Sequence, residues 1–428
     1  MKIIERTASS SNLKIILVPM PGTKTITAAF AVRAGWKYET LENHGIAHFL
    51  EHMTFRGTKK RPTSFNISKE IDSKGGFINA ATSAEMTVYW IKFPYQYTKI
   101  ALDILMDIIS NSLFNPEEIE KERGAIIQEV RMIHDTPTRF VPLVAWPKLL
   151  YGDQPAGRLI VGTEESIKAM NRAHFVDFLE NLYMDRNAAL CLAGRIPNVD
   201  YVFSQINAFF DDIRKGNPAI NKPPTIEIQN RPELFLETRD IQQSHIILGV
   251  RAYNLSHPKR YALGVLEAIL GGNPSSRMYM EIREKRGLAY YVHVFSNMQS
   301  DVGSFGTQAG VDKNGITEVI QLIISEYQKI CEEKIPNEEL KRAKDYIIGS
   351  AQMSLESSSA VVSNLCYQWA LEEKITSFAE ESREIRAVTA EDIRTVAQEI
   401  FVNKGLNLAI VGPHQGMEEE FLKILHFD

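Results

Sequence analysis

The tripeptide Val32–Ala34 (VRA) recurs in the second half of the chain as Val250–Ala252. A second stretch, Cys191–Gly194 (CLAG), recurs at the same offset as the similar apolar run Ala409–Gly412 (AIVG). Both matches are short, so two chance similarities are the alternative explanation. However, the two anchors lie far apart within each copy and keep one offset, which indicates an internal duplication of about 210–215 residues per copy.

Working outward from these anchors, the two halves predict the same succession of strands and helices. In the first half, apolar and alternating runs predict strands within residues 2–19, 25–34, 77–82, 87–93 and 188–194. In the second half they predict strands within residues 233–252, 288–298, 303–310 and 406–411. Runs with helical spacing lie between them. The sequence therefore predicts an α+β fold of two homologous domains, each a mainly antiparallel β-sheet packed with helices.

A polar segment with four prolines, residues 215–232, separates the two copies. Its composition is typical of a linker. We therefore expect an N-terminal domain at residues 1–214 and a homologous C-terminal domain at residues 233–428.

The overall composition excludes several classes of protein. A net charge of −5 at pH 7 argues against nucleic acid as the main partner. The three cysteines, Cys191, Cys331 and Cys366, are far apart and predict neither a thiolate zinc site nor a disulfide framework. No apolar run is long enough to predict a membrane span. Because the N-terminus lacks a signal-peptide pattern, we expect a cytoplasmic protein, with a matured organellar protein as the alternative.

The run His48–His52 (HFLEH) has the pattern H-x-x-E-H on a predicted helix that we expect Asn43 to cap. Residues four apart share a helix face, so His48 and His52 can offer two imidazole nitrogens to one metal ion. Glu51 lies at the edge of that face, where it can reach a water molecule beside the metal. His44, one turn earlier, is expected to be a surface residue or to support the ligands, because a catalytic zinc site keeps one position open.

The repeat offers an internal control for this motif. At the offset of the two anchors, the three polar residues of the motif correspond to apolar residues of the second copy, Leu266, Ile269 and Leu270. The fold therefore does not require histidines on this helix. This weakens the alternative that the motif is an amphipathic helix whose histidines are satisfied in the core or at the surface.

A third ligand is expected on the next long helix, which begins at Asn115–Glu117 (NPE). Glu122 and Glu129 lie two turns apart on one face of this helix. The stretch around Glu129 is mostly apolar, and a carboxylate there needs a partner, which a metal ion can supply. A salt bridge to Arg123 or Arg131, or a solvent-exposed face, is the alternative.

The motif, followed at this distance along the chain by Glu129, resembles the pitrilysin family of zinc peptidases, which includes insulysin-like enzymes and mitochondrial processing peptidases. The resemblance spans nearly the whole chain. It is carried by four stretches in the family's order, Ala47–Thr58 (AHFLEHMTFRGT), Gly75–Thr82 (GGFINAAT), Glu122–Glu129 and Arg286–Tyr290 (RGLAY). The chain length and the duplicated halves are similar to the short, processing-peptidase-like branch.

The resemblance implies one Zn²⁺ per chain, held by His48, His52 and Glu129, with Glu51 as the general base. It implies that Glu122 orients a ligand, in particular His52, because such supporting groups fix the tautomer and the ring geometry.

The resemblance also implies how a peptide is held. The strand Phe77–Thr82 would be an exposed edge that binds peptide as an added strand, pairing through the backbone of Asn79 and Ala80. Arg283 and Tyr290 match a pair that contacts substrate near the scissile carbonyl, where Tyr290 can donate to a developing oxyanion. Arg286 and Arg277 are alternatives to Arg283.

The function implied is a zinc-dependent endopeptidase that cleaves peptides or presequence-like segments in a clamshell cavity. Two copies of the chain, or this chain and a paralogous subunit, would form that cavity, so a homodimer or a heterodimer is expected. The alternative is a non-catalytic peptide-binding or scaffold subunit of a heteromeric processing peptidase.

Overall fold

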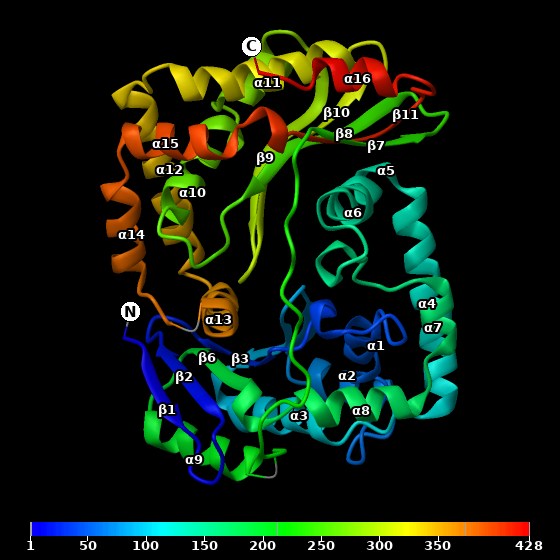
Figure 1. Ribbon diagram of the computed structural model, residues 1–428. Coiled ribbons are helices and arrows are strands. Elements are labelled where there is room, and N and C mark those ends of the chain that lie inside the picture. The colour runs from blue at the N-terminus through cyan, green and yellow to red at the C-terminus, as the bar shows by residue number, and fades with distance from the viewer. Residues whose placement is uncertain (1, 212, 373, 428) are drawn as a thin grey trace. The chain divides into compact units, whose positions relative to one another are not determined.

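A computed structural model describes residues 2–211, 213–372 and 374–427 (Figure 1). The described chain forms two compact units. Unit 1 comprises the described residues up to Arg131 together with Leu159–Pro223 and Met353–Thr376. Unit 2 comprises Met132–Arg158, Pro224–Gln352 and the described residues from Ser377 onward.

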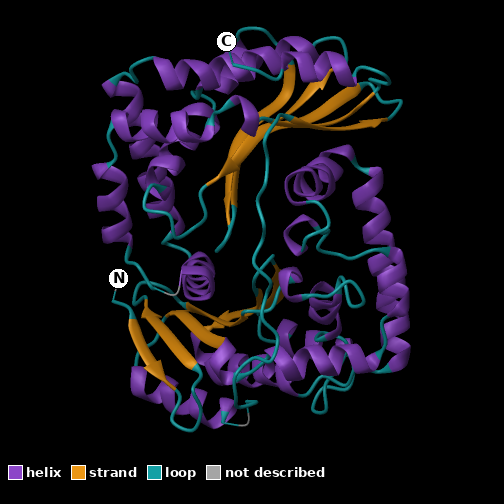
Figure 2. Cartoon of the chain, viewed as in Figure 1, coloured by secondary structure: helices purple, strands orange, loops and turns teal. Residues whose placement is uncertain are grey.

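Each unit is built on one β-sheet with helices on both faces (Figure 2). The first sheet has, in spatial order, the strands β1 (Ile4–Thr7), β2 (Lys14–Pro19), β6 (Ala188–Gly194), β3 (Thr25–Val32), β5 (Thr87–Pro94) and β4 (Phe77–Thr82). The second sheet has, in spatial order, β7 (Glu233–Thr238), β11 (Asn407–Gly412), β8 (Gln243–Ala252), β10 (Gly303–Asp312) and β9 (Ala289–Met298).

The two sheets share one topology over five strands, which confirms the predicted α+β fold with two similar halves. In each sheet one parallel pair, β2 with β6 or β7 with β11, is followed by antiparallel pairs out to the edge. The pairing register keeps the offset of the sequence repeat. Ala193 pairs with Thr27 in the first sheet, and Val411 pairs with His245 in the second. Each residue of the second pair follows its counterpart in the first pair by the same number of positions that separates the two VRA tripeptides.

One face of each sheet is covered by helices from the same half of the chain. On the first sheet these are α1 (Ile46–Met53), α2 (Ser64–Asp72), α3 (Thr98–Ser110), α4 (Pro116–Asp135), α7 (Glu164–Ala169), α8 (Arg172–Leu182) and α9 (Val199–Phe210). On the second they are α10 (Arg260–Gly271), η6 (Tyr279–Glu284), α11 (Ile316–Glu332), α12 (Asn337–Ser354), α14 (Phe378–Ala387), α15 (Ala390–Ile400) and α16 (Glu418–Ile424).

The other face of each sheet is covered by a segment from the opposite half of the sequence. In unit 1 this cover is α13 (Ser358–Tyr367), which packs on the first sheet (Figure 1). In unit 2 it consists of three short helical pieces, α5 (Pro137–Phe140), η3 (Val141–Ala145) and α6 (Trp146–Tyr151). At the repeat offset the exchanged residues 132–158 correspond to 350–376, so the exchange is reciprocal.

The arginine of the recurring VRA tripeptide holds the exchanged segment in both units. In unit 1, Arg33 donates from Nε to the carbonyl of Ala370 and from Nη2 to that of Trp369, at 3.0 Å each. In unit 2, Arg251 donates from Nη2 to the carbonyl of Leu150. In each copy, the arginine of the tripeptide therefore donates hydrogen bonds to backbone carbonyls of a segment that comes from the other copy.

The structure also describes the state of the cysteines and the lengths of the apolar helices. The cysteines are unbridged, and two of them, Cys191 on β6 and Cys366 on α13, are buried. Among the described residues, no helix combines the length and the apolar character needed to cross a membrane.

Replacing Arg33 by Met removes two hydrogen bonds to the exchanged segment and keeps most of the apolar stem. We expect Arg33→Met to lower the thermal unfolding midpoint, because hydrogen bonds to a charged group contribute about 1.5–3 kcal/mol. Limited proteolysis with mass-spectrometric mapping should show faster cleavage within residues 353–372. Arg172→Met, at an exposed helix position, is the control. Equal cleavage rates in both variants would contradict the anchoring role.

Candidate active site

The motif helix α1 begins at Ile46, after Gly45, so the prediction that Asn43 caps it is wrong. Gly45 adopts a φ of +94°, which a residue with a side chain rarely takes. The orphan N–H groups at this end are satisfied by a carboxylate from outside the helix. Glu39 accepts hydrogen bonds from Gly45 at 2.7 Å and from Ala47 at 2.9 Å. No local sequence pattern predicts this distant cap.

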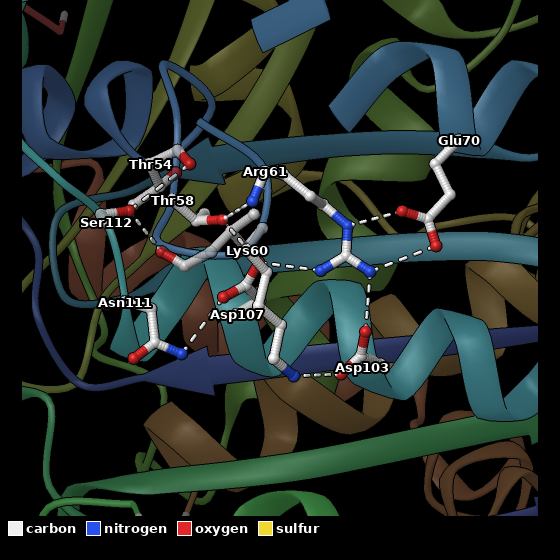
Figure 3. A network of polar contacts seen from close by, with 10 residues as sticks. Thr54, Thr58, Lys60, Arg61, Glu70, Asp103, Asp107, Asn111 and Ser112 are labelled. Atoms are coloured by element: carbon white, nitrogen blue, oxygen red, sulfur yellow. Dashed lines mark hydrogen bonds and ion pairs between the residues drawn. The ribbon is translucent and has the colours of Figure 1, made fainter. Parts of the chain in front are cut away.

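A buried arginine fixes the loop that follows α1 (Figure 3). Arg61 pairs with Asp107 at 2.8 Å and with Asp103 at 2.7 Å, both on α3, and with Glu70 on α2 at 2.7 Å. Thr58 of the loop donates its hydroxyl to Asp107 at 2.5 Å. These contacts join the loop after α1 to α2 and to α3, and α2 is followed after a short turn by β4.

Three potential metal ligands converge between α1 and α4. The imidazoles of His48 and His52 lie on successive turns with ring centroids 4.6 Å apart. Glu129 approaches from α4, with Oε2 3.7 Å from Nε2 of His48. One ligand atom from each of the three side chains lies within 4.8 Å of the other two. The sequence-predicted ligands are therefore brought together.

Glu122 supports this group from the preceding turns of α4. Its buried carboxylate lies 3.1 Å from Nδ1 of His52 and 2.5 Å from Nη2 of Arg56. Holding Nδ1 leaves Nε2 of His52 for the metal. Arg56 is not among the sequence-predicted residues, although it belongs to the stretch AHFLEHMTFRGT; it lies in the turn that follows α1.

The charges at the site follow from burial and from these contacts. Burial, together with the nearby charge of His52, lowers the pKa of His48 to about 3, so His48 is neutral at pH 7, the form that binds metal. Burial opposes the charged form of His52, but the hydrogen bond that its Nδ1 donates to Glu122 and the surrounding carboxylates raise its pKa. Burial raises the pKa of Glu51, and hydrogen bonds from Thr82 act in the opposite direction.

The donor set fits a zinc ion. Two imidazoles and one carboxylate are a common ligand set of catalytic zinc, and ligands around a tetrahedral ion lie roughly 3.4 Å apart. The 3.7 Å between His48 and Glu129 is close to that spacing. The buried Nδ1 of His48 has no hydrogen-bond partner among the described residues. The arginines considered as alternative partners of Glu129 form ion pairs with other carboxylates, Arg123 with Glu120 and Arg131 with Glu164.

The general-base candidate Glu51 is tied to the edge strand. Thr82, the last residue of β4, donates its hydroxyl to Oε2 of Glu51 at 2.5 Å. Among the described strands β4 has one neighbour, β5, so it is an edge strand of the sheet. Asn79 is exposed and Ala80 is buried near the middle of β4. Thr82 is not among the sequence-predicted site residues, although it ends the stretch GGFINAAT.

His44 is not a surface residue, so that expectation is wrong, and the expectation that it supports the ligands stays a prediction. It is buried, and its Nε2 lies 2.7 Å from the carbonyl oxygen of Leu159. Its role is to tie the loop before α1 to a distant part of unit 1.

Arg283 and Tyr290 belong to unit 2. Tyr290 lies on β9 with 74 % of its surface exposed. The guanidinium of Arg283 lies over the ring of Tyr279 at 5.2 Å and has no ion pair among the described residues.

The two alternative arginines are both paired. Arg277 forms a bidentate pair with Glu339 at 2.9 and 2.8 Å, and Arg286 binds Glu281 at 2.6 Å. Among these three arginines, Arg283 is therefore the one whose charge is free for a ligand.

Comparison with known proteins identifies the family. Residues 14–164 match the profile described as insulinase (peptidase family M16), and residues 169–347 match the profile described as the peptidase M16 inactive domain. An uncharacterized zinc protease of Streptomyces coelicolor is 30 % identical over 426 residues, covering 96 % of this chain and 90 % of the relative. An uncharacterized zinc protease of Rickettsia bellii is 32 % identical over 405 residues, covering 94 % and 96 % of the two chains.

The fold has close counterparts among solved structures. A protease from Helicobacter pylori superposes with a TM-score of 0.89 at 22 % identity, covering 96 % of this chain and 99 % of that one. With sequence relatives matched over nearly their full length and both halves matched by profiles of one family, the chain belongs to peptidase family M16.

Proposed function

We propose that this chain is a zinc-dependent endopeptidase that cleaves peptides or presequence-like segments bound as an added strand on β4. The observation that carries the proposal is the convergence, within unit 1, of three ligand atoms inside 4.8 Å and a glutamate hydrogen-bonded to the edge strand. An open sheet edge holds a peptide extended through backbone hydrogen bonds. The complete ligand set argues against the alternative of a non-catalytic scaffold subunit.

The residues present support a consistent mechanism. Zinc held by His48, His52 and Glu129 would act as a Lewis acid that polarises the scissile carbonyl. Glu51 takes a proton from the attacking water and later passes it to the leaving nitrogen. A carboxylate has about four lone-pair sites, so Glu51 can accept from water and from Thr82 together. Glu122 holds the Nδ1 proton of His52 and keeps its Nε2 unprotonated.

The second half of the chain would complete the substrate site. We propose that Tyr290 donates to the developing oxyanion and that Arg283 binds the substrate near the scissile bond. The exposed phenol and the unpaired guanidinium support these roles. The clamshell would be a homodimer, or a heterodimer with a paralogous subunit, and the pair could act on the zinc site of the same chain or of the partner.

Removing the general base should strongly reduce the rate of cleavage and leave zinc binding unchanged. We expect Glu51→Gln to lower kcat by about 10²–10⁴-fold, the usual contribution of general acid–base catalysis. Cleavage sites in an unfolded peptide library, mapped by mass spectrometry with and without a chelator, measure the activity, and elemental analysis measures zinc. Wild-type protein that holds no zinc after metal loading would rule out the proposed function.

The two glutamates of α4 should differ in what their loss does. Glu129→Ala removes a ligand and should abolish stable zinc binding, whereas Glu122→Gln should weaken it by about 10–100-fold. Zinc affinity is measured by competition with a chromogenic chelator. Glu120→Gln, on the same helix but paired with Arg123 away from the site, is the matched control. Unchanged zinc affinity in Glu129→Ala would show that the third ligand lies elsewhere.

Mixing two inactive chains tests whether the second half acts on a partner. If Tyr290 acts in trans, a mixture of Glu51→Gln and Tyr290→Phe chains should regain activity, because some mixed dimers hold one intact pair of groups. Subunit exchange is verified with differently tagged chains. Lack of rescue after verified exchange would place Tyr290 in cis or remove it from the mechanism, and the activity of the Tyr290→Phe chain alone separates these two outcomes.

A further inference from the structure

We propose that Thr82 is a positioning residue for the general base, whose hydroxyl holds Glu51 at the end of the strand that receives the peptide. This inference rests on the proposed peptidase function. It adds a link between the strand that binds substrate and the group that moves the proton. Thr82 reaches Glu51 at 2.5 Å, which is short for a hydrogen bond and typical of a hydroxyl donating to a carboxylate.

The direction of this hydrogen bond is fixed by its surroundings. An ionised carboxylate only accepts, so the hydroxyl hydrogen of Thr82 must point at Glu51. The neighbouring Thr87 hydroxyl lies 3.4 Å from Thr82 and donates to the carbonyl of Ala34 at 2.6 Å. The Thr82 hydroxyl therefore donates to one carboxylate oxygen of Glu51 and leaves the other oxygen free of it.

Thr82 is itself held rigidly, because the turn that follows it is locked to the loop before α1. The N–H of Lys37 donates to the carbonyl of Ala84 at 2.9 Å. At Gly35 a Cβ would lie 2.1 Å from the carbonyl oxygen of Ser83, so only glycine allows this close approach. A β-branched side chain on a fixed strand has few rotamers, so the hydroxyl position is defined by the backbone.

A buried charge cluster adds to this lock. Glu85, in the same turn, accepts from the buried ammonium of Lys37 at 3.2 Å and from Lys222 at 2.6 Å. Lys222 lies in the segment predicted from its prolines to be a linker. The turn after Thr82 is therefore fixed by charged contacts from two other parts of unit 1.

The second copy contains a similar contact between its edge strand and its helix, made by a glutamate two residues before the position that corresponds to Glu51. Thr82 pairs with Thr87 across the first sheet, and at the repeat offset Thr87 corresponds to Phe305, which pairs with Ser296 on β9. Ser296 is thus the counterpart of Thr82. Its hydroxyl and its N–H both donate to Glu267 on α10, the N–H at 3.0 Å. Both copies join the edge strand to the helix through a hydroxyl and a carboxylate.

This pair of contacts separates a structural role from a catalytic one. If the contact served only to hold the helix to the strand, its loss should have the same consequence in either copy. In the first copy alone the carboxylate stands beside two imidazoles. We therefore expect the Thr82 contact to affect kcat, and the Ser296 contact to affect stability alone.

The experiment compares Thr82→Val, which is isosteric and lacks the hydroxyl, with Thr82→Ser, which keeps it, and with Ser296→Ala in the second copy. In zinc-loaded full-length protein, Thr82→Val should lower kcat about tenfold to a hundredfold, since a hydrogen bond to a charged group is lost. KM and zinc stoichiometry should stay near wild type. Thr82→Ser should restore most of kcat, and Ser296→Ala should retain it. Should Thr82→Val fail to fold, Thr82→Ala takes its place.

A second readout is independent of turnover. In the Glu51→Gln background, Thr82→Val should leave the Kd of a fluorescent substrate peptide unchanged, because the strand edge itself is intact. A weakened Kd that matches the loss in kcat would overturn the proposal and make Thr82 a strand-stabilising residue. Equal kcat in Thr82→Val and wild type would also overturn it, with the peptidase function intact. An inactive wild-type protein would instead refute the proposed function.

Discussion

The fold depends on an arginine that ties each sheet to a segment from the other half of the chain. A sheet in this chain has two apolar faces, and the helices of its own copy cover one of them. The second face of the first sheet is covered by α13, and that of the second sheet by residues 137–151. Arg33 and Arg251 donate to carbonyls of these segments. Neither copy can bury both faces alone, so the two copies must fold as one molecule.

The candidate site in unit 1 depends on how the carboxylates on and around the buried helix α1 find hydrogen-bond partners. Glu39 and Glu122 contact α1 from outside, where they accept from Gly45 and lie beside His52, and Glu51 on α1 accepts from Thr82 of β4. Such carboxylates are costly without partners. The partners also set the functional states, because Glu122 fixes the tautomer of His52 while burial keeps His48 neutral. Glu129, on the same helix as Glu122, is the third residue of the group that could hold a metal ion.

Features that repeat in the sequence are predictable, and features that need long-range contacts are not. The strands, the duplication and the pairing of His48 with His52 follow from periodicity and spacing, and the structure has strands within a few residues of the predicted bounds. The reciprocal exchange is beyond such prediction, because nothing local in Arg33 shows that its acceptors lie at Trp369 and Ala370.

The same reason explains the errors near the site. Asn43 has the right chemistry for a cap, but Gly45 turns the chain and lets Glu39 take that role. The predicted domain bounds, 1–214 and 233–428, describe the two copies of the repeat, whereas the compact units also exchange one segment each.

Glu267 changes how the loss of the metal ligands in the second copy is understood. The apolar replacements Leu266, Ile269 and Leu270 are buried and would suggest that the helix kept nothing polar. Glu267, two residues before the counterpart of Glu51, is nevertheless polar and half-buried; it accepts hydrogen bonds from Ser296, and burial raises its pKa in spite of those hydrogen bonds. This half-buried carboxylate joins α10 to β9 through its hydrogen bonds with Ser296. A hydroxyl–carboxylate contact between edge strand and helix thus occurs in both copies, and only in the first copy does the carboxylate lie on the helix that carries two imidazoles.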